Sequence, residues 1–202
     1  VDYTNSFSVS GFSQNNNSVN YNTTKITDNG WHLNFKGTAN QSKTDSAKAK
    51  GNESDGTKNY QVNLNGNKWL NDNLKLKSTF YYRDTKSDYD SSATKEDSVF
   101  ADNKMYALQT GVERKTNNSL DNIMFHYHNY DRKYYVQGRK DKYYSESLVV
   151  KAEREVVFDN KISYGFGSEY KYDWGHYLTK TFASHMGGHL SNLGIFANAG
   201  YK

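Results

Sequence analysis

Acidic side chains form the most prominent set of residues in this sequence that could do chemistry. Glu53 and Asp55 lie in one polar stretch, and Asp88 and Asp90 lie in the next. Ca²⁺ takes six to eight oxygen ligands, so carboxylates from two converging loops would suit it. The alternative is that both loops are simply solvated, and the lysines interleaved over 48–58 favour that interpretation.

A second candidate site combines aromatic rings and cations. Tyr134, Tyr135, Arg139 and Tyr143 border a charged segment, and rings with cations suit an anionic or planar small-molecule ligand. The alternative is an aromatic girdle that faces lipopolysaccharide. His126 and His128 share a strand parity and would co-ligate a metal only with a third ligand, so a polar wall is the simpler interpretation.

The sequence favours neither an enzyme nor a nucleic-acid-binding protein. It contains no Gly-x-Ser-x-Gly motif and no phosphate-binding loop, and its dispersed acids form no catalytic pair. The net charge of +4 comes from scattered side chains rather than from a basic patch, so no nucleic-acid partner is expected. Without cysteine, the chain has neither disulfides nor thiolate metal sites.

The elements that must position these residues are strands. Leu74, Leu76, Phe80 and Tyr82 alternate with polar or amphipathic residues, and such alternation recurs in about ten segments. A mean hydropathy of -1.00 is very polar, yet eighteen Tyr, ten Phe and three Trp are enough to cover one face of a sheet. We therefore predict an all-β fold, an antiparallel meander of about ten strands with one apolar face.

The connections between these strands alternate in length. Long external loops are expected near 41–57, 84–103, 129–142 and 175–189, whereas the turns near 27–30, 66–73, 117–118 and 159–160 are short. This asymmetry is typical of transmembrane β-barrels. A soluble barrel also alternates, but its apolar face points inward. Trp31, Tyr82 and Trp174 near strand ends are typical of an interfacial girdle, so residues 1–202 are predicted to form one transmembrane β-barrel domain.

Two local strings carry a resemblance to a known family. They are the segment from Glu53 to Tyr60, with Asp-Gly before a strand start, and Tyr81-Tyr82-Arg83-Asp84 at a strand end before a Ser/Asp-rich loop. With the strand lengths and loop order, the chain resembles the barrel of a TonB-dependent outer-membrane receptor, of the cobalamin- or siderophore-receptor type. Such barrels have 22 strands, so the chain is expected to be a partial barrel that lacks the plug domain and the C-terminal strands.

The resemblance implies a function. A receptor of this kind takes up a scarce, bulky nutrient, a cobalamin or an iron-siderophore, across the outer membrane of a Gram-negative cell. Its implied partners are outer-membrane lipid and lipopolysaccharide, the nutrient, and the TonB complex, which acts through the missing plug. In cobalamin receptors calcium orders the two loops in question, and Glu53 and Asp55 occupy the matching place before Gly56.

Two other interpretations stay open from the sequence. One is a small complete outer-membrane barrel of eight to ten strands that acts as a porin or surface protein. The other is a soluble, aromatic-rich β module that binds glycans on its tyrosines. If the chain is a partial barrel, we also expect the edge strands near Phe7 and Ile195 to have no partner strand on one side.

Overall fold

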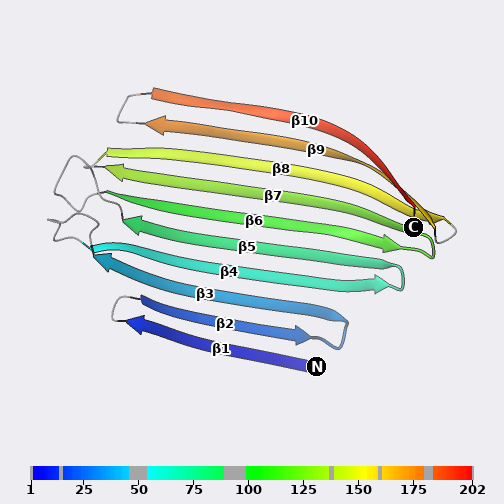
Figure 1. The fold of residues 1–202 in the computed structure, drawn as a ribbon, viewed down its shortest axis with the longest axis horizontal. Helices are drawn as coiled ribbons and strands as arrows, with labels where there is room; N and C mark the ends of the chain where they lie inside the picture. Colours follow the sequence, from blue (N-terminus) through cyan, green and yellow to red (C-terminus); the bar gives the residue numbers. More distant parts are fainter. Residues whose placement is uncertain are drawn as a thin grey trace.

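A single antiparallel sheet contains all the strands of the chain (Figure 1). The computed structural model describes residues 2–13, 16–45, 54–88, 99–136, 139–158, 161–179 and 184–201. The strands are β1 (Asp2–Ser13), β2 (Asn16–Ile26), β3 (Trp31–Asp45), β4 (Ser54–Asn71), β5 (Leu74–Asp88), β6 (Phe100–Lys115), β7 (Ser119–Val136), β8 (Arg139–Phe158), β9 (Ile162–Thr179) and β10 (Ser184–Tyr201). Each pairs with the next in sequence order, which confirms the predicted ten-stranded meander.

The sheet is not closed within the described residues. β1 and β10 lie at opposite edges, so the segments around Phe7 and Ile195 have no partner strand on one side, as predicted. Both chain ends lie at the end of the sheet that carries the short turns (Figure 1). The described residues include no helix long and apolar enough to cross a membrane.

The strands extend further into the predicted long loops than the sequence pattern indicated. β7 and β8 together cover all of 129–142 except 137–138, and β5 continues to Asp88. The residues added are mostly polar, such as Asp131, Arg132 and Lys142. Polarity on both faces predicts a loop. Ladder hydrogen bonds do not require an apolar face, however, so a strand can continue into a fully polar region.

The register gives the sheet one apolar and one polar face. One ladder position on the apolar face aligns Phe35, Leu64, Phe80, Leu108, Tyr127, Leu148 and Tyr172 across seven strands. These side chains are not a core: Leu64 is 44% exposed and Ile123 on the same face is 55% exposed. Among the described residues the fully buried hydrophobic side chains are Val99 and Ala101. Exposing such a surface to water would be very unfavourable.

Charged residues bound the apolar face at both ends. The limits are Lys58 and Lys68 on β4, Lys104 and Arg114 on β6, and Glu146 and Arg154 on β8. At about 3.3 Å per residue the bounded segments are about 26–33 Å long. For strands tilted by about 40° this corresponds to roughly 20–25 Å along the barrel axis, close to the apolar band of an outer-membrane barrel. We call this region the apolar band.

The apolar band runs obliquely across the ladder. In the ladder Lys25 on β2 pairs with Leu33 on β3, and Leu33 pairs with Gly66 on β4. Gly66 lies two residues from Lys68, on the side of the long connections. In the same way Lys68 pairs with Leu76 on β5, and Leu76 pairs with Val112 on β6, which is again two residues from Arg114. The lower limit of the band therefore steps down the ladder as strand number rises. Strands that tilt relative to a barrel axis produce this offset.

The tight turn at Thr27–Gly30 shows why local sequence sets the short connections. Gly30 has a φ of 82°, a region that favours glycine, and its N–H donates to the Thr27 carbonyl at 2.9 Å. The Thr27 hydroxyl also accepts the Trp31 N–H at 2.9 Å. This turn fixes the register of β2 with β3.

Candidate functional site

One ladder position on the polar face carries a continuous row of hydrogen-bonding and aromatic side chains. We call it the polar row, and its members, one from each of β1 to β9, are Ser10, Ser18, Asn40, Asn59, Thr85, Asn103, Arg132, Tyr143 and Tyr177. The row lies in the half of the sheet that carries the long connections. It changes along its length from hydroxyls and amides to a guanidinium and then to phenols.

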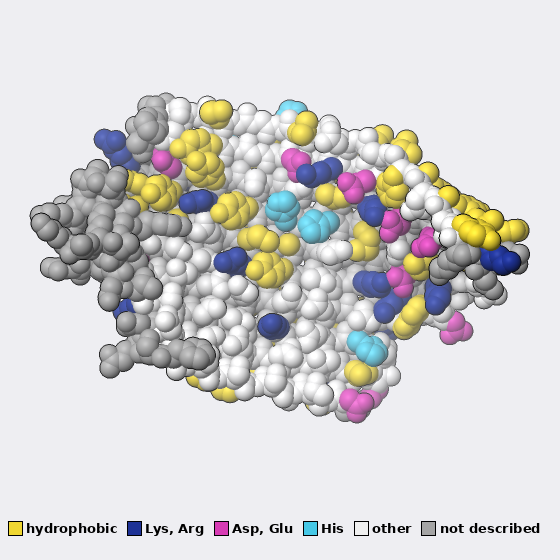
Figure 2. Space-filling model, viewed as in Figure 1, with side chains coloured by type: hydrophobic (Ala, Val, Ile, Leu, Met, Phe, Trp, Pro, Cys, Tyr) yellow, Lys and Arg dark blue, Asp and Glu magenta, His cyan; other side chains and the backbone are white. Residues whose placement is uncertain are grey.

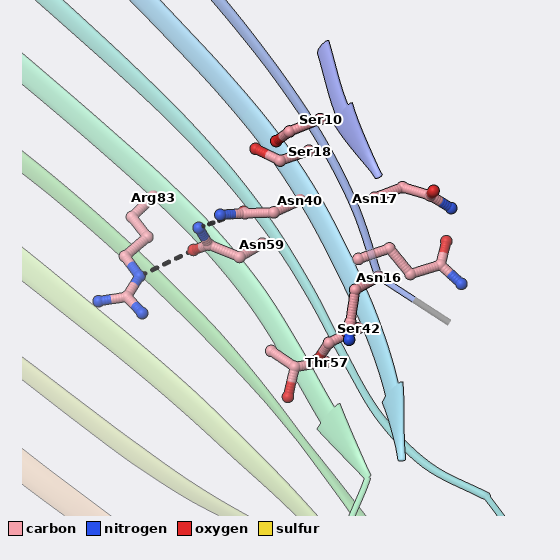
Figure 3. A pocket seen from close by; sticks show the side chains of 10 residues that line it. Ser10, Asn16, Asn17, Ser18, Asn40, Ser42, Thr57, Asn59 and Arg83 are labelled. Atoms are coloured by element: carbon pink, nitrogen blue, oxygen red, sulfur yellow. Dashed lines mark hydrogen bonds between the residues drawn. The ribbon is translucent and has the colours of Figure 1, made fainter. Parts of the chain in front are cut away.

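Asn59 is the centre of the amide part of the polar row. Its Nδ2 donates to Asn40 Oδ1 at 2.9 Å, and its Oδ1 accepts from Arg83 Nε at 3.0 Å and from Thr85 Oγ1 at 2.9 Å. Figure 3 shows Asn59 between Asn40 and Arg83, joined to each by a hydrogen bond. Asn59 and Thr85 are each only 7% exposed. The network therefore holds the Arg83 guanidinium in a fixed position on the polar face.

A cavity lies beside this network. It has a volume of about 370 Å³ and is lined by Ser10, Ser18, Asn40, Asn59 and Arg83, with further residues of β2 to β4. The lining residues carry hydroxyls, amides and one cation, and none of them is a hydrophobic residue. Such a lining suits a hydrophilic ligand with several acceptor oxygens.

The arginine and tyrosine part of the polar row forms a second cluster. The rings of Tyr143 and Tyr177 stack with centroids 4.2 Å apart, and the Arg132 guanidinium lies 5.9 Å from the centroid of the Tyr134 ring. Arg132 Nε is buried and has no hydrogen-bond partner among the described residues. The cluster therefore presents a cation whose Nε–H is unsatisfied, among three aromatic rings.

Tyr143 lies three residues beyond Glu146, outside the apolar band and toward the long connections. A hydrogen bond with Tyr177, together with burial, raises the pKa of the Tyr143 phenol. The single O–H of the Tyr143 phenol is therefore engaged with Tyr177.

The structure divides the predicted aromatic site between the two faces. Tyr134, Arg139 and Tyr143 belong to the polar face. Tyr135 belongs to the apolar face, where its ring stacks on Phe100 at 4.3 Å. Alternation along β7 separates Tyr134 from Tyr135, so these two neighbours cannot contact the same ligand.

Tyr135 lies instead in a group outside the predicted site. Lys86 lies 4.3 Å from the centroid of the Phe100 ring, and Lys140 lies 5.2 Å from that of Tyr135. This group sits beyond the apolar band on the same face. The alternative that the sequence left open, an aromatic girdle that faces lipopolysaccharide, stays a prediction for this group.

The predicted calcium ligands fall mostly outside the described residues. Glu53 and Asp90 are not described, and Asp55 is placed only as the ladder partner of Thr44. The Asp88 carboxylate is described, and its Oδ2 would lie 3.3 Å from a Cβ added at Gly56. The described residues contain no group of three or more acidic or histidine side chains that could hold a metal. The calcium site stays a prediction.

Charged pairs and histidines continue the polar face toward the short turns. Lys77 pairs with Glu113, Lys151 with Glu153 at 2.6 Å, and Lys171 with Asp173 at 2.9 Å. The rings of His126 and His128 lie on this face, 6.2 Å apart. Figure 2 shows one face of the molecule, with acidic, basic and histidine side chains over the middle of the sheet and toward the short-turn end. This surface is suited to contact with water rather than with lipid.

Sequence reasoning missed the roles of Asn59, Arg83, Arg132 and Tyr177. The alternation within each strand could have placed each of them on the polar face, but their alignment in adjacent strands depends on registers across the long connections. A search for rings and cations near one loop found only the members that are close in sequence. The structure adds the partners from neighbouring strands.

Comparison with known proteins gives matches of structure but not of sequence. No family model and no curated protein matches the chain. The siderophore receptor PiuA from Acinetobacter baumannii is similar at 11% identity with a TM-score of 0.65, over 96% of this chain and 36% of the receptor. The ferric-catecholate import receptor Fiu from E. coli K12, in its closed form, is similar at 10% identity with a TM-score of 0.62, over 91% and 40% of the respective chains.

A third structure extends the comparison. The RagAB peptide transporter matches at 10% identity with a TM-score of 0.55, over 92% of this chain and 30% of the matched chain. The chain thus spans well under half of each of these three structures. All three are receptors or transporters by name. Because nearly the whole chain aligns as one open meander, its fold is that of a ten-strand section of a TonB-dependent siderophore-receptor barrel.

Proposed function

We propose that this chain forms part of the wall of an outer-membrane receptor that takes up a scarce, bulky nutrient. The observation that carries the proposal is the exposed apolar band on one face, opposite a hydrogen-bonded polar row on the other. In a barrel the first would contact lipid and the second would line a water-filled interior. A soluble glycan-binding module would instead have to expose the apolar band to water.

The chemistry of the polar row favours an iron-siderophore over a cobalamin. Arg132 offers a positive charge among Tyr134, Tyr143 and Tyr177, and cation and rings together suit an anionic aromatic chelate. Two of the similar structures are a siderophore receptor and a ferric-catecholate import receptor, which supports the same ligand class. The amide and hydroxyl part of the row would contact the polar periphery of such a ligand.

The proposed role requires two kinds of partner, an energy-coupling complex and the lipids of the outer membrane. Transport of a bulky ligand against a gradient needs energy, which TonB-dependent receptors receive from the TonB complex through a plug domain. We propose the same coupling here, in a Gram-negative outer membrane where phospholipid and lipopolysaccharide surround the barrel. A small complete porin or surface barrel remains the second candidate, because it would share the two-faced wall.

A pair of neighbouring residues tests the ligand site. In the full-length protein, Tyr134→Ala should weaken binding of a synthetic ferric tris-catecholate about tenfold, because it removes a ring beside Arg132. Arg132→Gln should weaken it at least as much, because it removes the charge. Binding is measured by intrinsic fluorescence quenching in detergent, with cyanocobalamin as the comparison ligand.

The matched control is Tyr135→Ala, which removes a tyrosine ring from the opposite face of the same strand. Its affinity for the ferric tris-catecholate should stay within about twofold of the wild-type value. Equal losses at Tyr134 and Tyr135 would show that the polar row is not the ligand site. Tighter binding of cyanocobalamin than of the ferric chelate would reassign the ligand class.

A further inference from the structure

The apolar face contains a hollow near the short-turn end of β3 to β5. Its volume is about 510 Å³, within the range of small-molecule binding pockets, and its lining is largely apolar. Trp31, Leu33 and Phe35 border it on β3, Leu64 on β4 and Phe80 on β5. Side chains therefore do not cover this part of the apolar face uniformly.

Small residues create the hollow. Gly66 and Ser78 are ladder partners in its floor, and larger side chains surround them. A Cβ added at Gly66 would lie 3.3 Å from Leu33 Cδ2 and 3.9 Å from Trp31 Cζ3. Both atoms are distant parts of side chains that lean over the glycine. A larger side chain at position 66 would therefore occupy the hollow itself rather than break the backbone ladder.

Two lysines lie at the margin of the hollow. Lys25 on β2 is part of its lining, and its ladder partner Leu33 pairs in turn with Gly66. Two strand spacings, about 10 Å, therefore separate Lys25 from Gly66. Lys68 follows Gly66 by two residues on the same face, and its ammonium lies 5.7 Å from the centroid of a Trp31 ring. Both lysines mark the lower limit of the apolar band, where long side chains reach the lipid headgroups.

We propose that this hollow binds an anionic phospholipid of the periplasmic leaflet. One acyl chain lies over Gly66 and Ser78 against the rings of Trp31 and Phe80, and the phosphate sits between Lys25 and Lys68. An apolar hollow bordered by two cations at one end complements a lipid whose negative group lies at one end of an apolar chain. The short turns of outer-membrane barrels are periplasmic, which assigns the leaflet. The inference rests on the proposed membrane location.

Lipid retention by the full-length protein tests the site. The protein is reconstituted in vesicles of equal parts phosphatidylglycerol and phosphatidylcholine, extracted in mild detergent and examined by native mass spectrometry. The wild type should retain one phosphatidylglycerol in preference to phosphatidylcholine. Gly66→Leu, which fills the hollow, should lower that occupancy at least fivefold. Lys25→Gln combined with Lys68→Gln should remove the preference for phosphatidylglycerol.

Two controls separate the site from general effects on the wall. Ser168→Leu makes a small-to-large change on the same face at β9, and Lys104→Gln removes a lysine at the opposite limit of the apolar band; both should retain lipid like the wild type. Wild-type retention by Gly66→Leu, or equal retention of phosphatidylcholine and phosphatidylglycerol by the wild type, overturns the inference. Flotation of the protein with vesicles is scored first. Protein that does not float contradicts the proposed function, whereas floating protein with unchanged lipid retention contradicts the phospholipid site alone.

Discussion

At the scale of single residues, Asn59 shows how the polar face stays ordered without a hydrophobic core. Its amide uses both ends, donating to Asn40 and accepting from Arg83 and Thr85. A nearly buried amide with three satisfied contacts is rigid, because every rotation would break at least one hydrogen bond. The same residue thereby fixes the position of Arg83, the cation that borders the cavity.

Truncation of this amide should be costly. Asn59→Ala removes the acceptor of the Thr85 hydroxyl and one of the two acceptors of Arg83 Nε, which keeps only its bond to Thr85 Oγ1, so the free energy of unfolding should fall by about 1–3 kcal/mol. Urea denaturation of the vesicle-inserted protein measures the change. Asn67→Ala is the matched control on the same strand and face, since Asn67 makes no side-chain hydrogen bond within the described residues, and it should change stability by less than about 0.5 kcal/mol. Similar losses for the two variants would contradict the central role of Asn59.

At the scale of strands, the two kinds of connection differ in what the sequence reveals. The short turns are centred on Asn29, on Asp72, on 117–118 and midway between Phe158 and Ile162, and counting outward from each centre predicts the register of the strands it joins. The alternation of Leu74, Leu76, Phe80 and Tyr82 likewise predicts faces correctly. Fold class, strand order and face parity were therefore predictable from local patterns.

The registers across the long connections were not predictable. The alignment of Thr85 with Asn103, and of Arg132 with Tyr143, depends on how far each polar strand extends before it turns. No hydrophobic periodicity marks those ends, because the side chains there are polar on both faces. The polar row crosses three of the predicted long connections, so its assembly needed the structure even though each of its members is visible in the sequence.

Close contact between β6 and β7 limits the size of the side chain that β6 can hold at position 111. A Cβ at Gly111 would overlap the Ile123 carbonyl oxygen and the Met124 Sδ across the β6–β7 ladder. Gly111→Ala should therefore lower the free energy of unfolding by about 1–3 kcal/mol, since a backbone atom has to move. The shift in the urea midpoint of the reconstituted protein measures this effect.

Gly188 on β10 provides the matched control, because nothing lies within 4 Å of its added Cβ. Gly188→Ala should leave the midpoint unchanged or raise it slightly, since alanine loses less backbone entropy in a strand than glycine. A larger loss at Gly188 than at Gly111 would show that the β6–β7 contact is not the limiting one.

At the scale of the whole molecule, adjacent residues experience different solvents. Leu148 lies within the apolar band, whereas Val149 follows it on the polar face. If the apolar face contacts lipid, as proposed, a charge is costly at position 148 and tolerable at position 149. The environment of the wall can therefore be read from a single strand.

The two positions give a direct test of membrane insertion. Leu148→Arg should destabilise the vesicle-inserted protein by about 2–4 kcal/mol, because it places a charge in hydrocarbon. Val149→Arg adds the same side chain one residue further on and should cost much less, since it faces water. Urea unfolding in vesicles, followed by tryptophan fluorescence, compares them. Equal effects, or a greater loss at Val149, would contradict the assigned faces.

Because the apolar band runs obliquely across the sheet, the members of the polar row lie at different heights above the lower limit of the band. Ser18 lies seven residues above Lys25 on β2, Asn59 lies nine above Lys68 on β4, and Asn103 lies eleven above Arg114 on β6. With neighbouring strands about 4.8 Å apart and tilted by about 40°, each step along the row rises about 3 Å, or roughly 25 Å from β1 to β9. The polar row thus rises from β1 to β9, with its phenols and guanidinium at the upper end and its amides and hydroxyls at the lower end. A ligand that moved along it would descend by nearly the thickness of the hydrocarbon layer while exchanging one kind of contact for the next.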